Sequence, residues 1–356
     1  MNLSLIKELS RHSYICGEQS SKYYYLANED GIDIYNLKDN TLLFSFVNFQ
    51  AIIEILVTYD ERFLICLNRN DELLCFDLIK KEHVTTLTNF TNNYGHILSL
   101  TTSINRKEVI IIYSDNKDKN KSKMIRLSIP LFNLISVTSF ENKFISIRKS
   151  KVFNHYYLIN NNKISYYDLN FSYIGNISLN TDILNIKNCI SLDSPKRLLI
   201  QDFKKVYLLN SKYELYDEFS LINNDSFIMK YRSPEDVLNL KLEEDISIIF
   251  DSDICYSTGV YKDKYLVSLS NNILLKKPRF KLFDFSTTEL LVNLKILSNI
   301  STVLLLPNYI LISGSNGTYL FNENEKSELI ISNPNTSSLG IIHKERLINE
   351  IISNTT

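Results

Sequence analysis

The sequence contains no tryptophan, eight glycines and six prolines, and its only alanines are Ala27 and Ala51. Alanine has the highest helix propensity of the amino acids, so its scarcity argues against a mainly helical fold. The apolar content comes instead from Ile, Leu, 22 Tyr and 19 Phe, and residues of these types are common in β-strands. The composition therefore predicts an all-β protein.

An excess of charge of one sign is also lacking, because 39 basic and 40 acidic residues give a formal net charge of −1. No global field therefore attracts nucleic acid or anionic lipid, and such a contact would need a local patch. The five cysteines are odd in number, are widely spaced and form no C-x-x-C pair, which argues against a disulfide framework and a zinc knuckle. They are Cys16, Cys66, Cys75, Cys189 and Cys255.

The sequence also has no apolar run long enough to span a membrane, and the N-terminal segment MNLSLIKELSRHSY lacks the apolar region of a signal peptide. We therefore expect a soluble, non-secreted protein in a reducing, intracellular compartment. Apolar residues make up 44% and charged residues 22% of the chain, which is enough for a large core. No linker or composition break divides the sequence, so we expect one domain over residues 1–356.

What the sequence does contain is an internal repeat of about 40 residues, a period typical of β-propellers. Short strand-like runs such as LLCFDL (73–78) and FKLFDF (280–285) end in an apolar or aromatic residue followed by a polar one. These polar anchors are Asn36, Asp77, Ser128, Asp168, Asn210, Asp284 and Asn322. Seven anchors predict seven blades.

Two intervals between anchors are longer than the repeat. The polar insert DNKDKNKSK (115–123) lengthens the interval before Ser128 and has the composition of a solvated hairpin loop. The second long interval contains SPEDVLNLKLEED (233–245), where Ser233 and Pro234 are suited to a helix N-terminus. We interpret it as a short helical insert near 233–245. A degenerate extra blade that includes ISIIFDSDICY (246–256) is the alternative for residues 222–257.

Each anchor strand is preceded by a second apolar strand and a turn of Asn, Asp, Gly or Lys, as in RFLICLNRND before LLCFDL. Further strands lie upstream, as in AIIEILVTYDE (51–61), and downstream, as in NTLLFSF (40–46). Four strands per repeat are the content of a propeller blade. Either NLSLI (2–6) or the tail GIIHKERLI (340–348) is expected to pair with the last blade and close the ring.

The anchors resemble WD40 repeats, whose third strand ends in Trp-Asp. Phe-Asp occurs at Phe76-Asp77 and Phe283-Asp284, and Tyr-Asp at Tyr167-Asp168, while LISGSNGTYLFN (311–322) resembles the L-x-S-G-S-x-D-G-T-x-x-x-W-D run of that family. Gly95-His96 resembles the Gly-His pair that opens a WD40 repeat. The resemblance covers nearly the whole chain and implies a WD40-like β-propeller. Because tryptophan is absent, packing must replace much of the hydrogen-bond network with which that family stabilises its blades.

The layout of an N-terminal strand, two plain repeats and a third blade with a lysine-rich hairpin resembles WD-repeat subunits of the small-subunit processome, the nucleolar U3 particle. This resemblance implies a role in pre-18S ribosomal RNA processing and a nuclear or nucleolar location. Without it, a cytoplasmic location is expected.

Motifs of catalysis are lacking. None of the five histidines lies in an H-x-H or H-x-x-x-H pair, and no G-x-S-x-G, G-x-G-x-x-G or G-x-x-x-x-G-K-[ST] motif occurs. Asp251 and Asp253 could hold a divalent cation, but solvated loop acids explain them better. We therefore expect no catalytic residue, no cofactor, no metal and no small-molecule substrate.

The candidate contacts to RNA phosphates are basic residues in three local clusters, which would give affinity without reading sequence. They are Lys117, Lys119, Lys121 and Lys123 in the insert, Arg148, Lys149 and Lys151 in RKSK, and Lys276, Lys277 and Arg279 in KKPR. The tyrosine runs Tyr23–Tyr25, Tyr156–Tyr157 and Tyr166–Tyr167 are expected to fill the core between blades rather than to stack on RNA bases.

The leading hypothesis from sequence is a non-catalytic interaction scaffold, a protein subunit of an intracellular complex, with ribosome biogenesis as its most specific form. The alternatives are a partner subunit of an RNA-modifying enzyme and a propeller enzyme with a site in its central channel.

Overall fold

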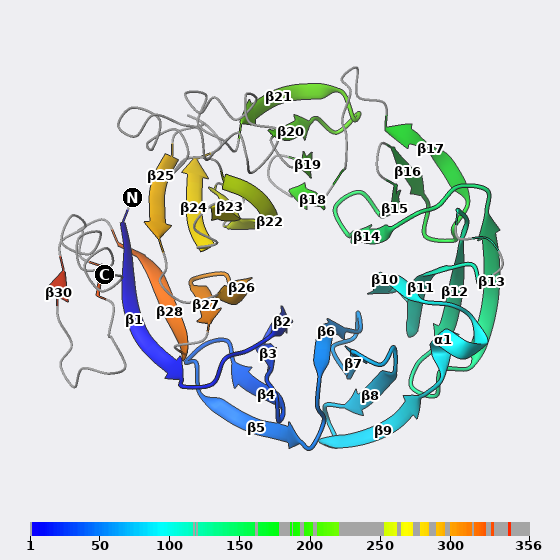
Figure 1. Cartoon of the computed structure of the whole chain (residues 1–356), viewed down its shortest axis with the longest axis horizontal. Helices are drawn as coiled ribbons and strands as arrows, with labels where there is room; N and C mark the ends of the chain where they lie inside the picture. The colour runs from blue at the N-terminus through cyan, green and yellow to red at the C-terminus, as the bar shows by residue number, and fades with distance from the viewer. Residues whose placement is uncertain are drawn as a thin grey trace, which may run out of the picture.

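The computed structural model describes most of the N-terminal two thirds of the chain and the strands of the remainder. The described residues are 2–116, 118, 120–160, 163–177, 186, 188–192, 196–201, 205–220, 253–261, 265–272, 278–284, 290–295, 300–314, 317–324, 329–330 and 341–342. They form small antiparallel sheets arranged in a ring around a central channel, which is a β-propeller (Figure 1). The predicted fold class is therefore confirmed.

Six blades each consist of four consecutive strands, with the first strand innermost and the fourth outermost. Blade I contains β2 (Cys16–Gln19), β3 (Tyr23–Ala27), β4 (Gly31–Asn36) and β5 (Leu42–Val47). Blade II contains β6 (Ile52–Val57), β7 (Phe63–Asn68), β8 (Leu73–Asp77) and β9 (Glu82–Leu87). Blade III contains β10 (Ile97–Thr102), β11 (Glu108–Ser114), β12 (Ser122–Ser128) and β13 (Leu134–Phe140).

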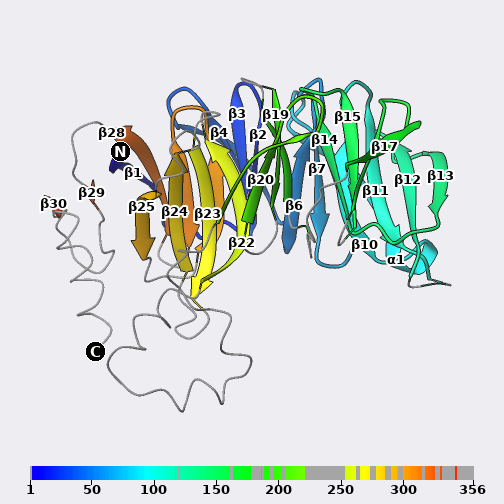
Figure 2. The ribbon, with the colours of Figure 1, turned by 90° about the horizontal axis from the view of Figure 1, so that it is seen from above.

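The next three blades continue the ring in chain order, and the sheets stand side by side when the ring is viewed from its edge (Figure 2). Blade IV contains β14 (Ser146–Ser150), β15 (His155–Ile159), β16 (Ile164–Tyr167) and β17 (Tyr173–Ile177). Blade V contains β18 (Asn188–Leu192), β19 (Arg197–Gln201), β20 (Lys205–Leu209) and β21 (Leu215–Ser220). Blade VI contains β22 (Asp253–Tyr261), β23 (Tyr265–Asn272), β24 (Pro278–Asp284) and β25 (Leu290–Lys295).

The ring is completed by a composite sheet, here called the closing sheet. It contains β26 (Ile300–Leu305), β27 (Ile310–Gly314) and β28 (Gly317–Asn324), and its outer strand is the N-terminal β1 (Asn2–Ser10). β1 pairs antiparallel with β28, from Asn2 opposite Asn324 to Ser10 opposite Thr318. In place of the predicted seven blades the ring thus has six blades of consecutive strands and the closing sheet, a seventh four-stranded sheet in which the last repeat supplies three strands and the N-terminus supplies the fourth. Of the two segments considered for closure, the N-terminal one is correct.

Four of the polar anchors lie at the end of the third strand of their blades or directly after it, and they stabilise the turn that follows. The Oδ1 atom of Asn36 accepts the N–H of Lys38 at 2.8 Å, and Asp77 Oδ1 accepts the N–H of Ile79 at 2.9 Å. Asp168 and Asn210 cap the corresponding turns of blades IV and V in the same way. An Asx turn of this kind needs only a short side chain with an acceptor oxygen, so Asn and Asp alternate freely at these positions.

The core consists of separate apolar clusters, and each lies between neighbouring sheets of the ring. One cluster joins blades II and III through residues such as Ile65 and Ile111, and another joins blades IV and V through Tyr157 and Ile200. The predicted tyrosine core is also present, because Tyr24, Tyr25, Tyr156 and Tyr157 are fully or almost fully buried. Since a single blade has no core of its own, its stability depends on both neighbours.

Helix is nearly absent. Among the described residues the only helix is α1 (Phe90–Asn93), between blades II and III, and none is long and apolar enough to cross a membrane. The predicted helical insert near 233–245 lies outside the described residues, as does 222–252 as a whole. Residues 253–257 belong to β22, the inner strand of blade VI. Two further short strands, β29 (Leu329–Ile330) and β30 (Ile341–Ile342), pair with each other.

Candidate functional site in the central channel

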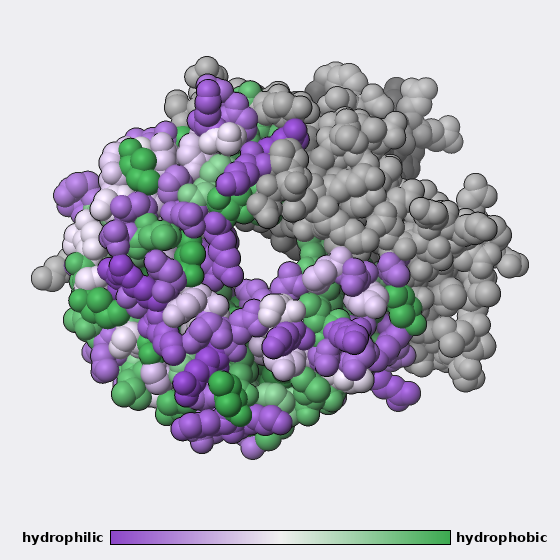
Figure 3. All heavy atoms as spheres, turned by 180° about the vertical axis from the view of Figure 1, so that it is seen from behind, coloured by the Kyte–Doolittle hydropathy of each residue, from purple (hydrophilic) through white to green (hydrophobic). Residues whose placement is uncertain are grey.

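The innermost strands of the sheets surround the central channel. A hole opens through the middle of the ring, and hydrophilic residues occupy much of the described part of its rim (Figure 3). The predicted basic cluster RKSK lies here and not on an outer loop, because Arg148 and Lys149 belong to β14 and Lys151 follows it. Of the ten predicted phosphate contacts, the structure brings these three together at the channel.

Lys149 connects three neighbouring inner strands. Its Nζ donates to Thr102 Oγ1 of β10 at 2.5 Å, and the hydroxyl of Thr102 donates to the carbonyl oxygen of Val57 in β6 at 2.8 Å. Thr102 is fully buried, so this chain of hydrogen bonds is shielded from solvent. The ammonium group is therefore held at a fixed place near the ends of β6 and β10.

Two glutamates that the sequence analysis did not select lie on the other inner strands. Glu18 belongs to β2 of blade I, and Glu54 belongs to β6 of blade II. A signal was present in the sequence, because Glu54 is the single charge within the apolar run AIIEILV. A lone acid in an inner strand is not by itself evidence of a site, since only the ring geometry reveals which charges it faces.

The electrostatics show that these groups share one space. The charges of Lys149 and Lys151 act on Glu18, although their blades are three places apart in the ring. The charge of Arg148 acts on Glu54, and so does that of Glu18. Interactions between such distant blades must cross the channel, so we place this cluster of two acids and three bases around it.

Burial dominates the titration of the cluster. Desolvation raises the pKa of Glu54 to about 7, although the nearby Arg148 opposes this shift, and it lowers the pKa of Lys149 to about 8. The pKa of Glu18 is also raised by burial, against the N–H of Gln19 and the charges of Lys149 and Lys151. Desolvation together with the neighbouring carboxylates raises the pKa of the Cys16 thiol to about 12. The opposite charges present in the channel therefore do not compensate for the loss of hydration.

Ion-pair partners are missing as well. Within the described part of the chain, no carboxylate oxygen lies within 4.0 Å of the cationic groups of Arg148, Lys149 or Lys151. Two buried polar atoms on the same inner strands, Gln19 Oε1 of β2 and Ser146 Oγ of β14, have no hydrogen-bond partner there. Buried polar groups without partners are rare in folded proteins, so their presence on two inner strands is informative.

The lysine-rich insert forms the turn between β11 and β12, as predicted, but its described lysines are neutralised. Lys123 Nζ lies 3.0 Å from Asp115 Oδ2, and Lys121 Nζ lies 3.6 Å from Glu141 Oε2. These pairs reduce the positive potential that a phosphate would meet. Lys117, Lys119, Lys276 and Lys277 lie outside the described residues, and only the backbone of Arg279, in β24, is described.

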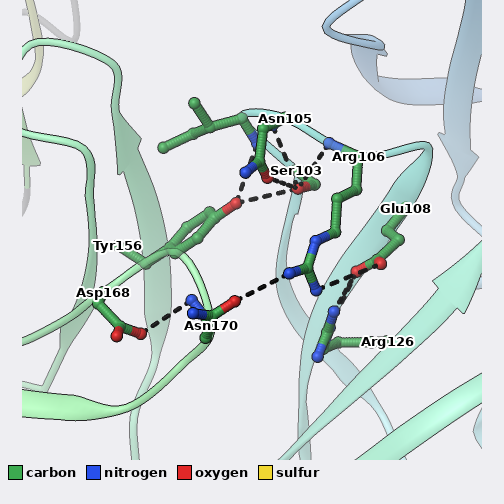
Figure 4. A network of polar contacts seen from close by, with 9 residues as sticks. Ser103, Asn105, Arg106, Glu108, Arg126, Tyr156, Asp168 and Asn170 are labelled. Carbon is green, nitrogen blue, oxygen red and sulfur yellow. Dashed lines mark hydrogen bonds and ion pairs between the residues drawn. The ribbon is translucent and has the colours of Figure 1, made fainter.

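A second polar cluster, between blades III and IV, is fully connected. Tyr156 Oη accepts the N–H of Ile104 at 2.9 Å, and Arg106 donates to Asn170 Oδ1 at 2.8 Å. Arg126 Nη2 donates to Glu108 Oε2 at 2.6 Å, and the two side chains form a partly buried ion pair (Figure 4). Because the charges in this cluster pair directly, we assign it to holding the two blades together.

The Gly95-His96 pair also has a structural place. A Cβ on Gly95, whose φ is +142°, would lie 2.0 Å from the carbonyl oxygen of Ser114, so only glycine fits. The Nδ1 atom of His96 forms a hydrogen bond of 2.7 Å with Oδ2 of Asp71, which lies in the β7–β8 turn. No group of three or more His, Cys, Asp or Glu among the described residues is arranged to hold a metal ion. Asp251 lies outside these residues, and only the backbone of Asp253 is described.

A cavity of about 600 Å³ lies between β1 and blade I, lined by residues such as Lys7, Asp30 and Val47. Its central acid, Asp33, accepts hydrogen bonds from Tyr14 Oη at 2.6 Å and from Ser45 Oγ at 2.5 Å. This carboxylate is satisfied within the protein, unlike Glu54. The cavity is therefore a weaker candidate than the channel.

The outer strand of blade III, the turn before it and the outer strand of blade IV carry exposed apolar side chains, here called the apolar rim. Leu134 of β13 and Tyr173 of β17 are 57% and 56% exposed, which is high for side chains of this size. The rim comprises Leu131, Leu134, Ile135, Val137, Tyr173 and Ile174. Such groups mark interaction surfaces more often than isolated apolar residues do.

Comparison of the sequence with known protein families and with curated proteins finds no match in either. The arguments about function therefore rest on the residues and the structure of this chain.

Proposed function

We propose that the protein is a non-catalytic interaction subunit of an intracellular assembly. The observation that supports this proposal is the apolar rim on the outer strands β13 and β17. A propeller fold often serves as an interaction scaffold, and the outermost strand of a blade has a backbone edge to which another chain can add a strand. A partner segment in extended conformation would cover Leu134 and Val137 while pairing with that edge.

The test is affinity purification of the tagged full-length chain, with the double variant Val137→Lys and Ile174→Lys beside it. Because lysines at the rim would have to be desolvated by an apolar partner, the variant should lose its partner proteins while keeping its melting temperature. Ile79→Lys is the matched control, since Ile79 is an isolated, 74% exposed side chain of blade II. Recovery of the wild-type chain only as a free monomer would refute the proposal.

The more specific form of the proposal is a subunit of the small-subunit processome, acting in the nucleolus. It rests on the layout of the first repeats and not on the rim. Co-purification of pre-18S ribosomal RNA with the wild-type chain would support it. A stable heterodimer with a single RNA-modifying enzyme, without that RNA, would favour the alternative role of a partner subunit.

A further inference from the structure

The central channel has features that a scaffold does not require. Four ionisable side chains from three inner strands and Lys151, directly after β14, share it, with the acids in blades I and II and the bases in blade IV. Acids and bases face each other without contact within 4.0 Å among the described residues. In a purely structural cluster, such as Glu108 with Arg126, opposite charges close onto each other.

We propose that the channel binds a small zwitterion with an ammonium group and a carboxylate, such as a free α-amino acid or a short peptide, between Glu18 and Glu54 on one side and Arg148 and Lys149 on the other. This is a binding site in addition to the interaction surface on the outer strands, and a small-molecule ligand was not expected from the sequence.

The arrangement of the charges determines this choice of ligand. A simple anion would be attracted by Arg148 and Lys149 but repelled by the two glutamates. A simple cation would be attracted by the two glutamates but repelled by Arg148 and Lys149. A molecule with both charges compensates the acids and the bases together, and each charge-assisted hydrogen bond adds affinity and orientation. Glu18 of β2 and Lys149 of β14 lie on inner strands that border the same channel (Figure 1), and the charge of each acts on the pKa of the other.

The unpartnered atoms indicate where further ligand contacts would form. Gln19 Oε1 is an acceptor next to Glu18, and Ser146 Oγ can donate or accept on the same strand as Arg148 and Lys149. An ammonium group has three N–H donors, and the carboxylates of Glu18 and Glu54 are acceptors for it. The hydroxyl of Ser146 can donate to a ligand carboxylate.

Binding should depend on pH in a way that identifies the groups. Glu54 faces Arg148, Glu18 and Cys16, and its pKa of about 7 means that it attracts an ammonium group only above that pH. Lys149 faces Glu18, Lys151 and Thr102, and its pKa of about 8 means that it loses its charge above that pH. The raised pKa of Glu18 adds to the acidic limb, and Cys16 stays neutral. Affinity should therefore be highest between about pH 7 and 8.

The experiment is a calorimetric titration of the full-length chain with each of the common L-α-amino acids in turn, and with acetate and ethylammonium as ligands that carry one charge. We expect at least one amino acid to bind, with a bell-shaped pH profile, and the two single-charge ligands to bind about ten- to hundredfold more weakly. Glu54→Gln and Lys149→Met should each reduce amino-acid affinity by a similar factor. Glu29→Gln and Lys38→Met are matched controls at exposed positions of blade I and should bind normally.

Three results would overturn the proposal. The first is that no amino acid binds to the wild-type chain at millimolar concentration. The second is that inorganic phosphate alone binds as tightly as any amino acid, which would make the channel a plain anion site. The third is binding that is independent of pH between about 6 and 9. All three are measured on the wild-type chain, so they decide the matter even if a variant fails to fold.

Discussion

At the scale of single residues, Glu54 of the channel differs from Asp33, Asp77 and Glu108. Asp33, Asp77 and Glu108 each accept hydrogen bonds from side chains or backbone groups, whereas Glu54 has no hydrogen bond or ion pair within the described residues. An ionised carboxylate that is desolvated without a partner destabilises the folded state. Such a group is retained when it serves a purpose other than stability.

The destabilisation of the folded state by the ionised Glu54 carboxylate predicts the effect of Glu54→Gln. The pKa of Glu54 is raised from 4.5 to about 7, so the folded state holds its proton more tightly than the unfolded chain does. The destabilisation caused by the ionised carboxylate is absent below about pH 4.5, grows as pH rises and is complete above about pH 7. The difference between the two pKa values makes it up to about 3 kcal/mol of unfolding free energy. We therefore expect Glu54→Gln to increase the free energy of unfolding at pH 8 and to leave it unchanged at acid pH.

Urea denaturation of the wild-type chain, Glu54→Gln and the exposed control Glu29→Gln, each at about pH 4.5 and about pH 8, measures this difference. A lower stability of Glu54→Gln at the higher pH would mean that the carboxylate is paired inside the protein, and the channel would then lack an available acid.

At the scale of strands, the segment after β1 is fixed to the closing sheet by hydroxyl groups. Ser313 Oγ of β27 accepts the N–H of Tyr14 at 2.7 Å, and Thr318 Oγ1 of β28 donates to the carbonyl oxygen of His12 at 2.9 Å. The two hydroxyls are 2.7 Å apart, and both side chains are fully buried. The Ser and Thr of the run LISGSNGTYLFN thus bind the N-terminal segment through their hydroxyls.

Ser313→Ala should therefore destabilise the protein. The substitution leaves the N–H of Tyr14 buried without an acceptor, which costs about 1 to 3 kcal/mol. Thermal denaturation should show a lower melting temperature for Ser313→Ala than for Thr41→Ala, which removes an exposed hydroxyl in blade I. Equal melting temperatures of the two variants would show that the Tyr14 N–H is satisfied in another way.

The strands themselves could be predicted from sequence because each is a local pattern. The anchors at Asn36, Asp77, Asp168 and Asn210 were found by spacing alone, since an Asx turn depends only on the next few residues. The channel cluster could not be found in this way. Glu18, Glu54 and Lys149 are far apart in sequence, and only closure of the ring brings them together. The basic cluster RKSK was noticed, but its position at the channel, with Arg148 and Lys149 in β14, could not be predicted from sequence.

At the scale of the whole molecule, the ring is stabilised only when it is closed. The core clusters lie between sheets, as in the packing of Tyr24 and Leu26 of blade I against Leu311 and Leu320 of the closing sheet. Each sheet therefore depends on its two neighbours, and at the seam the N-terminal β1 pairs with β28, which is far from it in the sequence. Opening that seam should weaken every interface.

Removing residues 2–10 tests this dependence. The deletion takes away the β1–β28 pairing and the wall of the neighbouring cavity that contains Lys7, and it leaves the edge of β28 unpaired. We expect a lower melting temperature and a broader transition than in the wild-type chain, because an open ring loses cooperativity between its blades. A synthetic peptide of residues 2–10 added in trans should bind and restore part of the melting temperature, since it replaces the backbone pairing with β28. A peptide of the same composition in scrambled order should not. An unchanged transition after the deletion would show that the ring is held by its blade interfaces alone and that β1 covers an edge without closing the structure.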